Sequence, residues 1–277
     1  MGKRRFINDS IDYILQHLDG NLSVKDVADH FNYSEFYFSR AFKAATGESV
    51  YAFIKRLKMD QSAIDLKLER HKSITDIGLD YGYSSSNYSS AFRKHHQRSP
   101  VEFRKSTRET VTANPFHPEK LESFMTFEEY ASKISIQILD ETTVLYERFI
   151  GNYEELKEKW FQFMETYKDF INTETRMIER FFDDPAIASP TCCLCDLCIT
   201  AEENCNLENI TKIKGGRFAV YRFEGEIKDI FCTLQGVFRV WLPHSGYEMS
   251  ERYGLNIYRA MDRTHGRVVM DLCIPIQ

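Results

Sequence analysis

One short unit occurs twice near the start of the chain, fifty positions apart and without a gap. The stretch SEFYFSRAFKAATGES (34–49) aligns with SSSNYSSAFRKHHQRS (84–99), and further upstream Asp26 matches Asp76. Phe42 matches Phe92 in the same alignment. A repeat this regular predicts two copies of one small structural module, which constrains the fold of the first hundred residues more than any other feature.

Each copy has the pattern of two short helices joined by a tight turn. In the first copy, Ser23 is a candidate N-cap for a helix that begins at Val24, and Ser34 can cap a second helix. In the second copy Ser73 takes the first role, and Gly82 makes the turn. Apolar residues at helical spacing predict the inner face of each second helix: Phe38, Ala41, Phe42 and Ala45, then Tyr88, Ala91 and Phe92.

The outer faces of these second helices carry polar and basic residues. They are Phe36, Ser39, Arg40 and Lys43 in the first copy, and Ser86, Asn87, Ser89, Ser90 and Arg93 in the second. This arrangement is typical of a helix-turn-helix, whose second helix enters the major groove of double-stranded DNA. Residues 50–70 predict one long helix between the copies, which would hold the two modules on successive major grooves about 34 Å apart.

The charge distribution agrees with a DNA partner for the first part of the chain. Residues 1–108 hold 18 Lys and Arg against 13 Asp and Glu, or +5, whereas residues 109–277 hold 18 against 28, or −10. A basic front and an acidic remainder indicate a polyanionic partner for the front alone.

Residues 8–106 resemble the DNA-binding domain of AraC/XylS transcription regulators. The resemblance is carried by LSVKDVADHFNYSEFYFSRAFKAATGES, IKRLKMDQSA and ITDIGLDYGYSSSNYSSAFRKHHQRSPVEFRK. It implies that Phe36, Ser39, Arg40 and Lys43 contact DNA in one half-site. Ser86, Asn87, Ser89 and Ser90 would do so in the other, although family members often have a basic residue where Ser90 stands. The resemblance also implies a transcription activator that contacts RNA polymerase.

A second duplication, at an offset of seventy-five, follows a segment rich in Ser, Thr and Pro. CDLCI (195–199) matches MDLCI (270–274), and Leu145-Tyr146 matches Val220-Tyr221. Each half predicts a strand (134–139; 210–213), a strand (143–149; 217–223), a helix (152–171; 226–242) and further strands. We therefore expect an α+β two-domain protein: an all-α double helix-turn-helix domain (1–106), a linker (107–127), and a domain of two βαββ units (128–277) with a groove between them.

Residues 128–277 resemble the GyrI-like effector-binding domain, through GGRFAVYRFEG, VWLPHSGYEMSERYGLNIYR and the terminal MDLCIPI. The resemblance implies a groove for a small lipophilic effector, often with a glutamate that meets cationic drugs. Asn256 stands where that glutamate is usual, so a cation preference requires Glu147, Glu224 or Glu226 instead. The candidate ligand-binding residues are Tyr146, Trp160, Phe163, Tyr221, Phe223, Trp241, Asn256 and Tyr258.

The cysteines leave an alternative, a thiol- or metal-responsive regulator that uses the run TCCLCDLCIT (191–200). On a strand, Cys193 and Cys195 share one face and Cys198 lies on the other, so the pairs spaced as in zinc sites cannot chelate one ion. We therefore expect buried structural thiols, with Cys193 and Cys195 as reactive groove residues if the pocket senses metals or electrophiles. The adjacent His95 and His96 should diverge by about 100° on a helix, so we expect no metal site there either.

Catalysis and membrane insertion are not expected. No nucleophile–base pair is visible, which disfavours a GyrI-like hydrolase, and no cofactor motif occurs. No apolar run is long enough to span a bilayer, and the first residues lack a signal-peptide core, so a cytoplasmic protein is expected.

Overall fold

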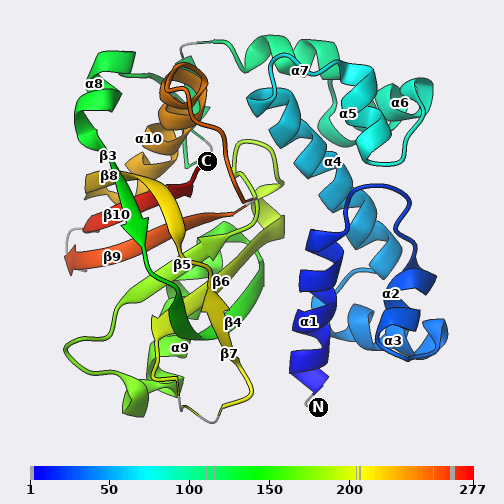
Figure 1. The fold of residues 1–277 in the computed structure, drawn as a ribbon, viewed down its shortest axis with the longest axis horizontal. Helices are drawn as coiled ribbons and strands as arrows, with labels where there is room; N and C mark the ends of the chain where they lie inside the picture. The colour runs from blue at the N-terminus through cyan, green and yellow to red at the C-terminus, as the bar shows by residue number, and fades with distance from the viewer. Residues whose placement is uncertain are drawn as a thin grey trace. The chain divides into compact units, whose positions relative to one another are not determined.

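The chain forms two compact units, residues 1–108 and 109–277, in a computed structural model (Figure 1). The structure describes residues 3–109, 111–114, 116–203, 205, 207–251, 253–262 and 266–277. The first unit is all-helical and the second combines a large sheet with helices, so the predicted α+β two-domain class is confirmed.

Seven helices build the first unit: α1 (Lys3–Gln16), α2 (Val24–His30), α3 (Glu35–Thr46), α4 (Val50–Leu68), α5 (Ile74–Asp80), α6 (Ser85–His96) and α7 (Pro100–Ser106). The predicted N-caps are present, since the side chains of Ser23, Ser34 and Ser73 accept hydrogen bonds from backbone amides of α2, α3 and α5. These caps satisfy amides that have no partner within the helix, so each helix begins where its serine stands.

The inner faces of the reading helices α3 and α6 are as predicted at most positions. Phe38 and Phe42 are fully buried on α3, and Tyr88 and Phe92 are fully buried on α6. Ala45 is the exception, because it is exposed in the last turn of α3. The apolar stripe therefore ends one turn earlier than its spacing predicts.

A lysine on α4 holds the two modules together. The Lys58 ammonium donates hydrogen bonds to the carbonyl of Gly20, ahead of α2, and to the carbonyl of Tyr81 at 3.1 Å, after α5. Burial lowers the pKa of Lys58. The same corner is closed by the Tyr81 hydroxyl, which donates to Asp65 on α4 at 2.6 Å. One charged group on the connecting helix therefore contacts the backbone of both repeats.

The second unit is built on one eight-stranded antiparallel sheet with the strand order β3-β8-β10-β9-β5-β6-β4-β7. The strands are β3 (Ile134–Leu139), β4 (Thr142–Gly151), β5 (Met177–Phe181), β6 (Cys193–Thr200), β7 (Ile210–Ile213), β8 (Gly216–Glu226), β9 (Gly254–Asp262) and β10 (Arg267–Pro275). The two repeats meet at the β5–β9 pair in the centre of the sheet. They form one continuous sheet rather than two facing sheets.

The edge strands are exchanged between the repeats. β3 is the first strand of the first repeat but pairs with β8 of the second, and β7 is the first strand of the second repeat but pairs with β4 of the first. Each repeat therefore depends on the other for its outermost strand.

The predicted linker, residues 107–127, contains regular structure and belongs to the second unit from residue 109 onward. β1 (Val111–Asn114) and β2 (His117–Ser123) form a separate antiparallel hairpin. The prolines of this segment suggested a linker. A two-stranded hairpin, however, leaves the outer edge of each strand unpaired, and proline is tolerated at such an edge.

Three helices lie against the sheet: α8 (Phe127–Lys133), α9 (Leu156–Thr166) and α10 (Ile230–Gly236), which continues as a π-helical turn over Val237–Trp241. The ring of Tyr130 on α8 lies directly against Gly236, where an added Cβ would meet the tyrosine oxygen at 1.6 Å. Among the described helices, none combines the length and hydropathy that crossing a bilayer requires.

We predict that Gly236→Ala destabilises the second unit by about 1–3 kcal/mol or more, because Tyr130 or α10 must shift to admit the methyl group. Gly254→Ala is the control, since its Cβ would meet no atom closer than 3.9 Å. Urea unfolding of the full chain measures both. Equal midpoints for the two variants would contradict this packing.

Candidate functional site

The predicted DNA-reading residues of α3 lie on its outer face. Phe36, Arg40 and Lys43 are exposed, and Ser39 is half-buried beside them. The Arg40 guanidinium lies over the Phe36 ring, 5.5 Å from its centroid. Phe36 is 72% exposed, which excludes a core role for its side chain. A cation stacked on an aromatic ring is held in position without losing its hydrogen-bond donors.

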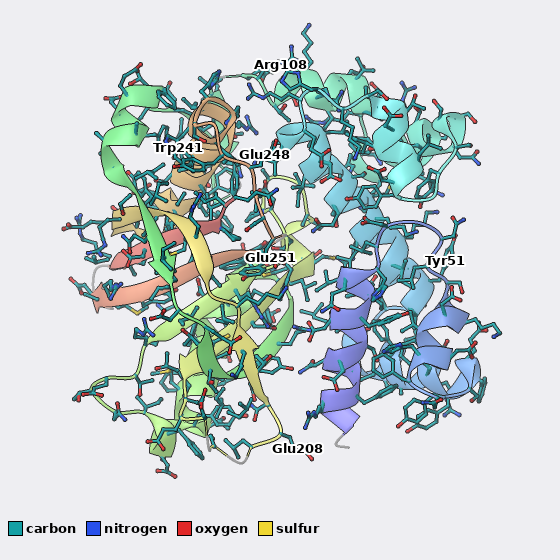
Figure 2. All side chains as sticks on the ribbon, in the orientation of Figure 1. Tyr51, Arg108, Glu208, Trp241, Glu248 and Glu251 are labelled. Carbon is teal, nitrogen blue, oxygen red and sulfur yellow. The ribbon has the colours of Figure 1, made fainter. Side chains whose placement is uncertain are left out.

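Two exposed tyrosines extend this surface beyond the sequence prediction. Tyr37, on α3, is half-exposed and stacks on Tyr33, with ring centroids 5.1 Å apart. Tyr51, at the start of α4, is 66% exposed and lies near the Lys55 ammonium (Figure 2). Exposed aromatic residues beside a basic helix were a usable signal in the sequence, but their exposure could not be inferred from helical spacing alone.

The outer face of α6 has a different chemistry. Its predicted residues Ser86, Asn87, Ser89, Ser90 and Arg93 are all exposed. Four of these five side chains are neutral, and only Arg93 is basic. The two reading helices therefore offer unequal sets of donors to DNA.

In the second unit, one row of side chains crosses the face of the sheet that α9 covers. Strand register places Tyr221, Leu272, Asn256, Glu179, Leu197 and Glu147 side by side in that order. Directly opposed residues share a face. Glu179 on β5 and Asn256 on β9 therefore face the same space at the centre of the row.

Glu179 is the polar centre of this face and was not among the predicted site residues. Its carboxylate is 3% exposed and accepts three hydrogen bonds: from Trp160 Nε1 at 2.6 Å, Tyr258 Oη at 2.8 Å and Asn256 Nδ2 at 3.0 Å. Burial raises the pKa of Glu179, and the three donors oppose that shift. Within the described part of the chain, no lysine or arginine forms an ion pair with Glu179.

Three of the eight predicted ligand residues therefore converge on one carboxylate. Phe163 adjoins them, because its ring packs edge-on against Trp160 with centroids 5.6 Å apart. Tyr221, Phe223 and Trp241 are buried in the second repeat, where Tyr221 packs against Tyr130. The structure separates Tyr146 from this set. Strand alternation turns it to the opposite face, opposite Cys198.

The three glutamates that the sequence suggested as counter-charges have other surroundings. Glu147 shares the face of Glu179 but accepts a hydrogen bond from the Tyr167 hydroxyl at 3.0 Å. Glu224 is exposed, and Glu226 forms an ion pair with Lys228 at 2.7 Å. Glu179 is therefore a better candidate for the counter-charge of a cationic ligand than any of these three glutamates.

The tip of the β1–β2 hairpin reaches both repeats at the helix-covered face. The Phe116 ring lies 5.9 Å from Tyr153, just ahead of α9, and 6.1 Å from Phe231 on α10. Asn114 anchors the hairpin by donating to the Lys228 carbonyl at 3.0 Å. The segment expected to be a linker therefore bridges the two halves of the domain.

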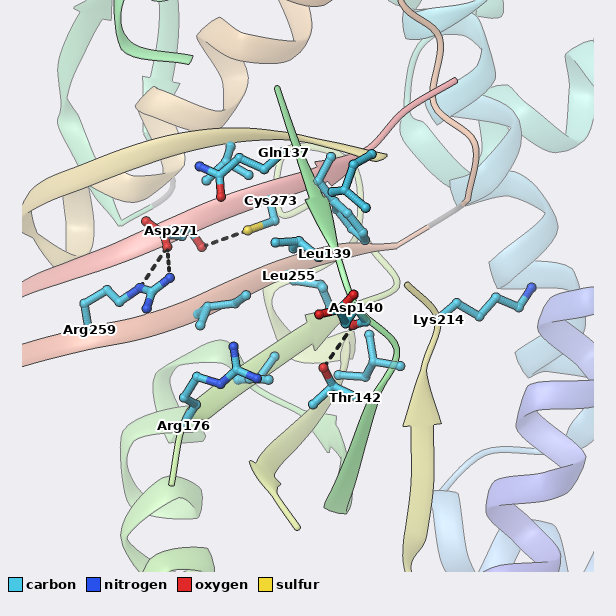
Figure 3. Close-up of a pocket in the computed structure, with 16 residues that line it drawn as sticks. Gln137, Leu139, Asp140, Thr142, Arg176, Lys214, Leu255, Arg259, Asp271 and Cys273 are labelled. Carbon is cyan, nitrogen blue, oxygen red and sulfur yellow. Dashed lines mark hydrogen bonds and ion pairs between the residues drawn. The ribbon is translucent and has the colours of Figure 1, made fainter. Parts of the chain in front are cut away.

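A pocket of about 170 Å³ lies on the opposite face of the sheet (Figure 3). Its floor is apolar, with Ile178, Leu255 and Ile257 contributed by both repeats. Arg259 at its rim is held by Asp271 at 2.7 Å, and Lys214 extends away from it (Figure 3). None of the eight predicted ligand residues lines this pocket.

The repeated aspartates of CDLCI and MDLCI are structural. Asp196 accepts hydrogen bonds from Arg148 and Arg180, and its counterpart Asp271 accepts from Arg222 and Arg259. Burial opposes ionisation of Asp196, but its two arginines outweigh burial and lower its pKa. Each repeat thus contains one acid held between two arginines.

The cysteines follow the predicted alternation. Cys193 and Cys195 share a face with their sulfurs 3.8 Å apart, and Cys198 points the other way. Burial raises the pKa of all three thiols, which keeps them protonated and unreactive. Among the described residues, no cluster of potential metal ligands includes a cysteine.

Comparison with known proteins agrees with this architecture. Residues 132–277, more than half of the chain, match the model of the GyrI-like small molecule binding domain. The chain belongs to the GyrI-like family. Residues 27–106 match the model of a helix-turn-helix domain, which confirms the AraC-type first unit.

The transcriptional regulator Rob of Salmonella typhimurium is 32% identical to this GyrI-like protein over 108 residues, which are 39% of this chain and 37% of Rob. The regulatory protein SoxS of Escherichia coli is 30% identical over 105 residues, 38% of this chain and 97% of SoxS. The match thus spans about a third of Rob's length.

Two solved structures match one unit each. The C-terminal domain of AraT, a response regulator from Geobacillus stearothermophilus, is 28% identical and covers 36% of this chain and 84% of its own, with a TM-score of 0.35. The EcmrR C-terminal domain is 14% identical and covers 52% and 96%, with a TM-score of 0.43.

We predict that Glu179 makes the second unit less stable as pH rises. Because its folded-state pKa is raised, the free energy of unfolding should fall with increasing pH above the ordinary glutamate pKa of about 4.3 and level off above the raised value. Glu179→Gln should remove this slope. Urea unfolding at pH values from about 4 to about 8 measures it, with Glu147→Gln as the control. An unchanged slope in Glu179→Gln would assign the pH dependence to other groups.

Proposed function

We propose that this protein is a DNA-binding transcription regulator whose GyrI-like domain binds a small, lipophilic cation, with Glu179 as the counter-charge. The observation that carries the proposal is a buried carboxylate held by three neutral donors on a face rich in aromatic rings. A DNA-binding role also implies that the protein acts in the cytoplasm, without catalytic activity.

The chemistry of the site favours a cation over an anion or a neutral ligand. An ionised carboxylate buried without a positive partner is unfavourable, and a bound cation would supply that partner. The faces of Trp160 and Tyr258 add attraction for positive charge. A perturbed acid in such surroundings is a common mark of a functional site.

Entry of a ligand requires movement, because Trp160, Glu179 and Asn256 are each less than a tenth exposed. Trp160, which donates to Glu179, is a side chain that a ligand would displace, and we propose that the nearby Phe116, packed on Tyr153, moves with it. Phe116 lies on the hairpin that begins shortly after the first unit ends at residue 108, so displacement of the hairpin is a direct way to link effector binding to the DNA-binding unit.

We predict that Glu179→Gln weakens binding of tetraphenylphosphonium about 10- to 100-fold, because the amide has the same shape but no charge. Binding of a neutral aromatic compound of similar size should change little. Calorimetric titration of the full chain measures both affinities.

Glu147→Gln is the matched control, since Glu147 lies on the same face and also accepts a tyrosine hydrogen bond. Asn256→Ala should weaken binding less than Glu179→Gln, because it removes one donor and leaves the charge. Equal affinity of wild type and Glu179→Gln for the cation would place the effector elsewhere, with the pocket on the opposite face as the next candidate.

We predict that the two reading helices contribute unequally to DNA binding. Arg40 can bridge guanine O6 and N7, a contact that contributes about 1–3 kcal/mol, whereas the short hydroxyls of α6 make single hydrogen bonds. Arg40→Ala should therefore lose specific affinity sharply, and Ser90→Ala should change it little. Titration on one operator at fixed salt measures both. A larger loss for Ser90→Ala, or a palindromic footprint, would contradict this division.

We further infer that the protein activates transcription through contact with RNA polymerase, as its AraC-type first unit suggests. In vitro transcription from a promoter that carries the operator tests this inference. Transcript levels should rise with added protein, and a fall would identify a repressor.

A further inference from the structure

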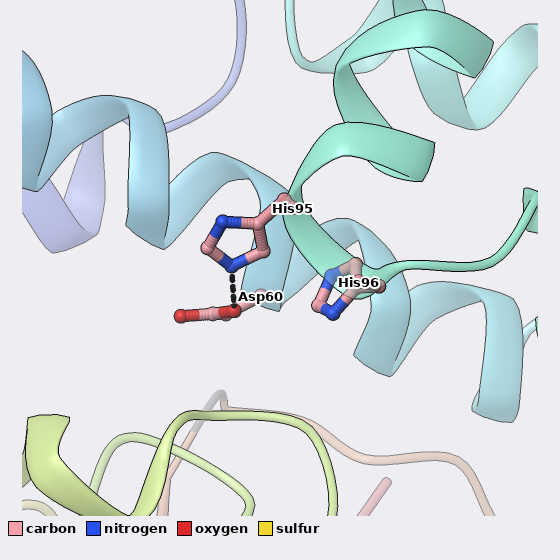
Figure 4. A group of neighbouring side chains, drawn as sticks. All are labelled: Asp60, His95 and His96. Atoms are coloured by element: carbon pink, nitrogen blue, oxygen red, sulfur yellow. Dashed lines mark hydrogen bonds and ion pairs between the residues drawn. The ribbon is translucent and has the colours of Figure 1, made fainter.

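Three side chains suited to binding metal ions converge in the first unit. Asp60 lies on α4, and His95 and His96 end α6 (Figure 4). One ligand atom from each lies within 4.8 Å of the other two, and no other such trio occurs in the described part of the chain. We infer that this trio is a binding site for a divalent transition-metal ion of the zinc, nickel or cobalt type.

The convergence reverses the expectation that adjacent histidines diverge. His95 Nε2 lies 2.8 Å from Asp60 Oδ1, and His96 Nε2 lies 3.2 Å from the carbonyl oxygen of Met59, the preceding residue on α4. The two rings meet edge to face with centroids 4.5 Å apart. Both imidazoles therefore reach the same turn of α4, because that helix passes beneath the end of α6.

The donors have the right chemistry for such an ion. Two imidazoles and one carboxylate supply three ligands and leave a fourth position for water, and N and O donors of this kind suit zinc, nickel and cobalt. A carbonyl can only accept, so the His96 proton is on Nε2 and its Nδ1 carries a free lone pair. The His96 ring packs on Phe92 and Phe103, with ring centroids 4.4 Å and 5.7 Å apart.

The distances between the ligand atoms and the charge of the site also suit a divalent metal ion. A tetrahedral ion with bonds of about 2.1 Å holds its ligand atoms about 3.4 Å apart, so the trio needs a shift of about 1 Å. His95 would bind the ion through Nε2 and carry its single proton on Nδ1, so the neutral ring exchanges tautomers and no net proton is lost. Arg56 approaches Asp60 at 3.9 Å but is itself neutralised by Glu48 at 2.5 Å. With neutral imidazoles, these groups sum to one negative charge.

A metal ion bound at this site would affect α6, the second DNA-reading helix. His95 and His96 form its last turn, and Asp60 belongs to the helix that connects the two modules. A bound ion would replace the His95–Asp60 hydrogen bond with coordination bonds between α6 and α4, while His96 Nε2 keeps its hydrogen bond to the Met59 carbonyl. It would thereby fix the reading helix that offers fewer charged groups to DNA.

Cobalt binding to the full-length protein tests the inference. After dialysis against a chelator, the wild type should bind one Co²⁺ per chain by calorimetry, with a visible spectrum typical of N and O ligands. His95→Gln should weaken binding at least about tenfold, because it removes one of three ligands. His244→Gln is the matched control, since His244 lies in the other unit and should leave the affinity unchanged.

Asp60→Asn provides a second variant that should also weaken binding, because it keeps the side-chain shape but removes the charge. Three results would overturn the inference: no stoichiometric binding by the wild type, equal affinity in His95→Gln, or a thiolate-to-cobalt charge-transfer band in the 1:1 complex. The last of these would assign the ion to the cysteines.

Discussion

The antiparallel pairing of β5 with β9 is the interaction on which the second unit depends. Four residue pairs, from Ile178–Ile257 to Phe181–Gly254, join two repeats into one sheet. The same pairing places Glu179 opposite Asn256, so the amide that replaces the usual glutamate becomes a hydrogen-bond donor to a carboxylate on the next strand. The carboxyl group at the centre of this face therefore stands on β5, directly opposite Asn256 of β9.

The two units each bury one charged side chain, but they use it differently. Lys58 donates to backbone carbonyls of both helix-turn-helix modules, and those carbonyls belong to fixed turns. Glu179 accepts from three side chains, which can rotate to other partners. The first arrangement stabilises one geometry, whereas the second can exchange its neutral donors for a ligand. Two buried side chains of similar exposure therefore have different partners: fixed backbone carbonyls for Lys58 and rotatable side chains for Glu179.

Sequence reasoning succeeded where the determinants are local. Serine caps, helical apolar spacing and the gapless repeats predicted α2 to α6, since helix ends and faces depend on residues a few positions apart, whereas α1 and α7 were not predicted. The same local logic placed Cys193 and Cys195 on one face.

Sequence reasoning failed where the pairing of distant segments determines which residues meet. Glu179 stands in the short strand MIERF, and only the register with β9, seventy-seven residues later, shows that it meets Asn256. A charged residue within an apolar alternation was the available signal. Tyr146 was grouped with the other aromatics because the repeats align it with Tyr221, although the two lie on opposite faces. The hairpin at 111–123 was missed because its partner, α10, lies more than a hundred residues away.

The exchanged edge strands give the domain the architecture of a domain-swapped dimer joined into one chain. Each repeat lends its first strand to the other, as two subunits of a domain-swapped dimer would. In a true homodimer the position of Glu179 would be occupied twice, and two like charges would face each other across the symmetry axis. The covalent version has Asn256 at the equivalent place in the second repeat, because Asn256 pairs with Leu272 as Glu179 pairs with the matching Leu197. Fusion of the two halves therefore permits a solitary carboxylate at the centre of this face, where a homodimer would have two.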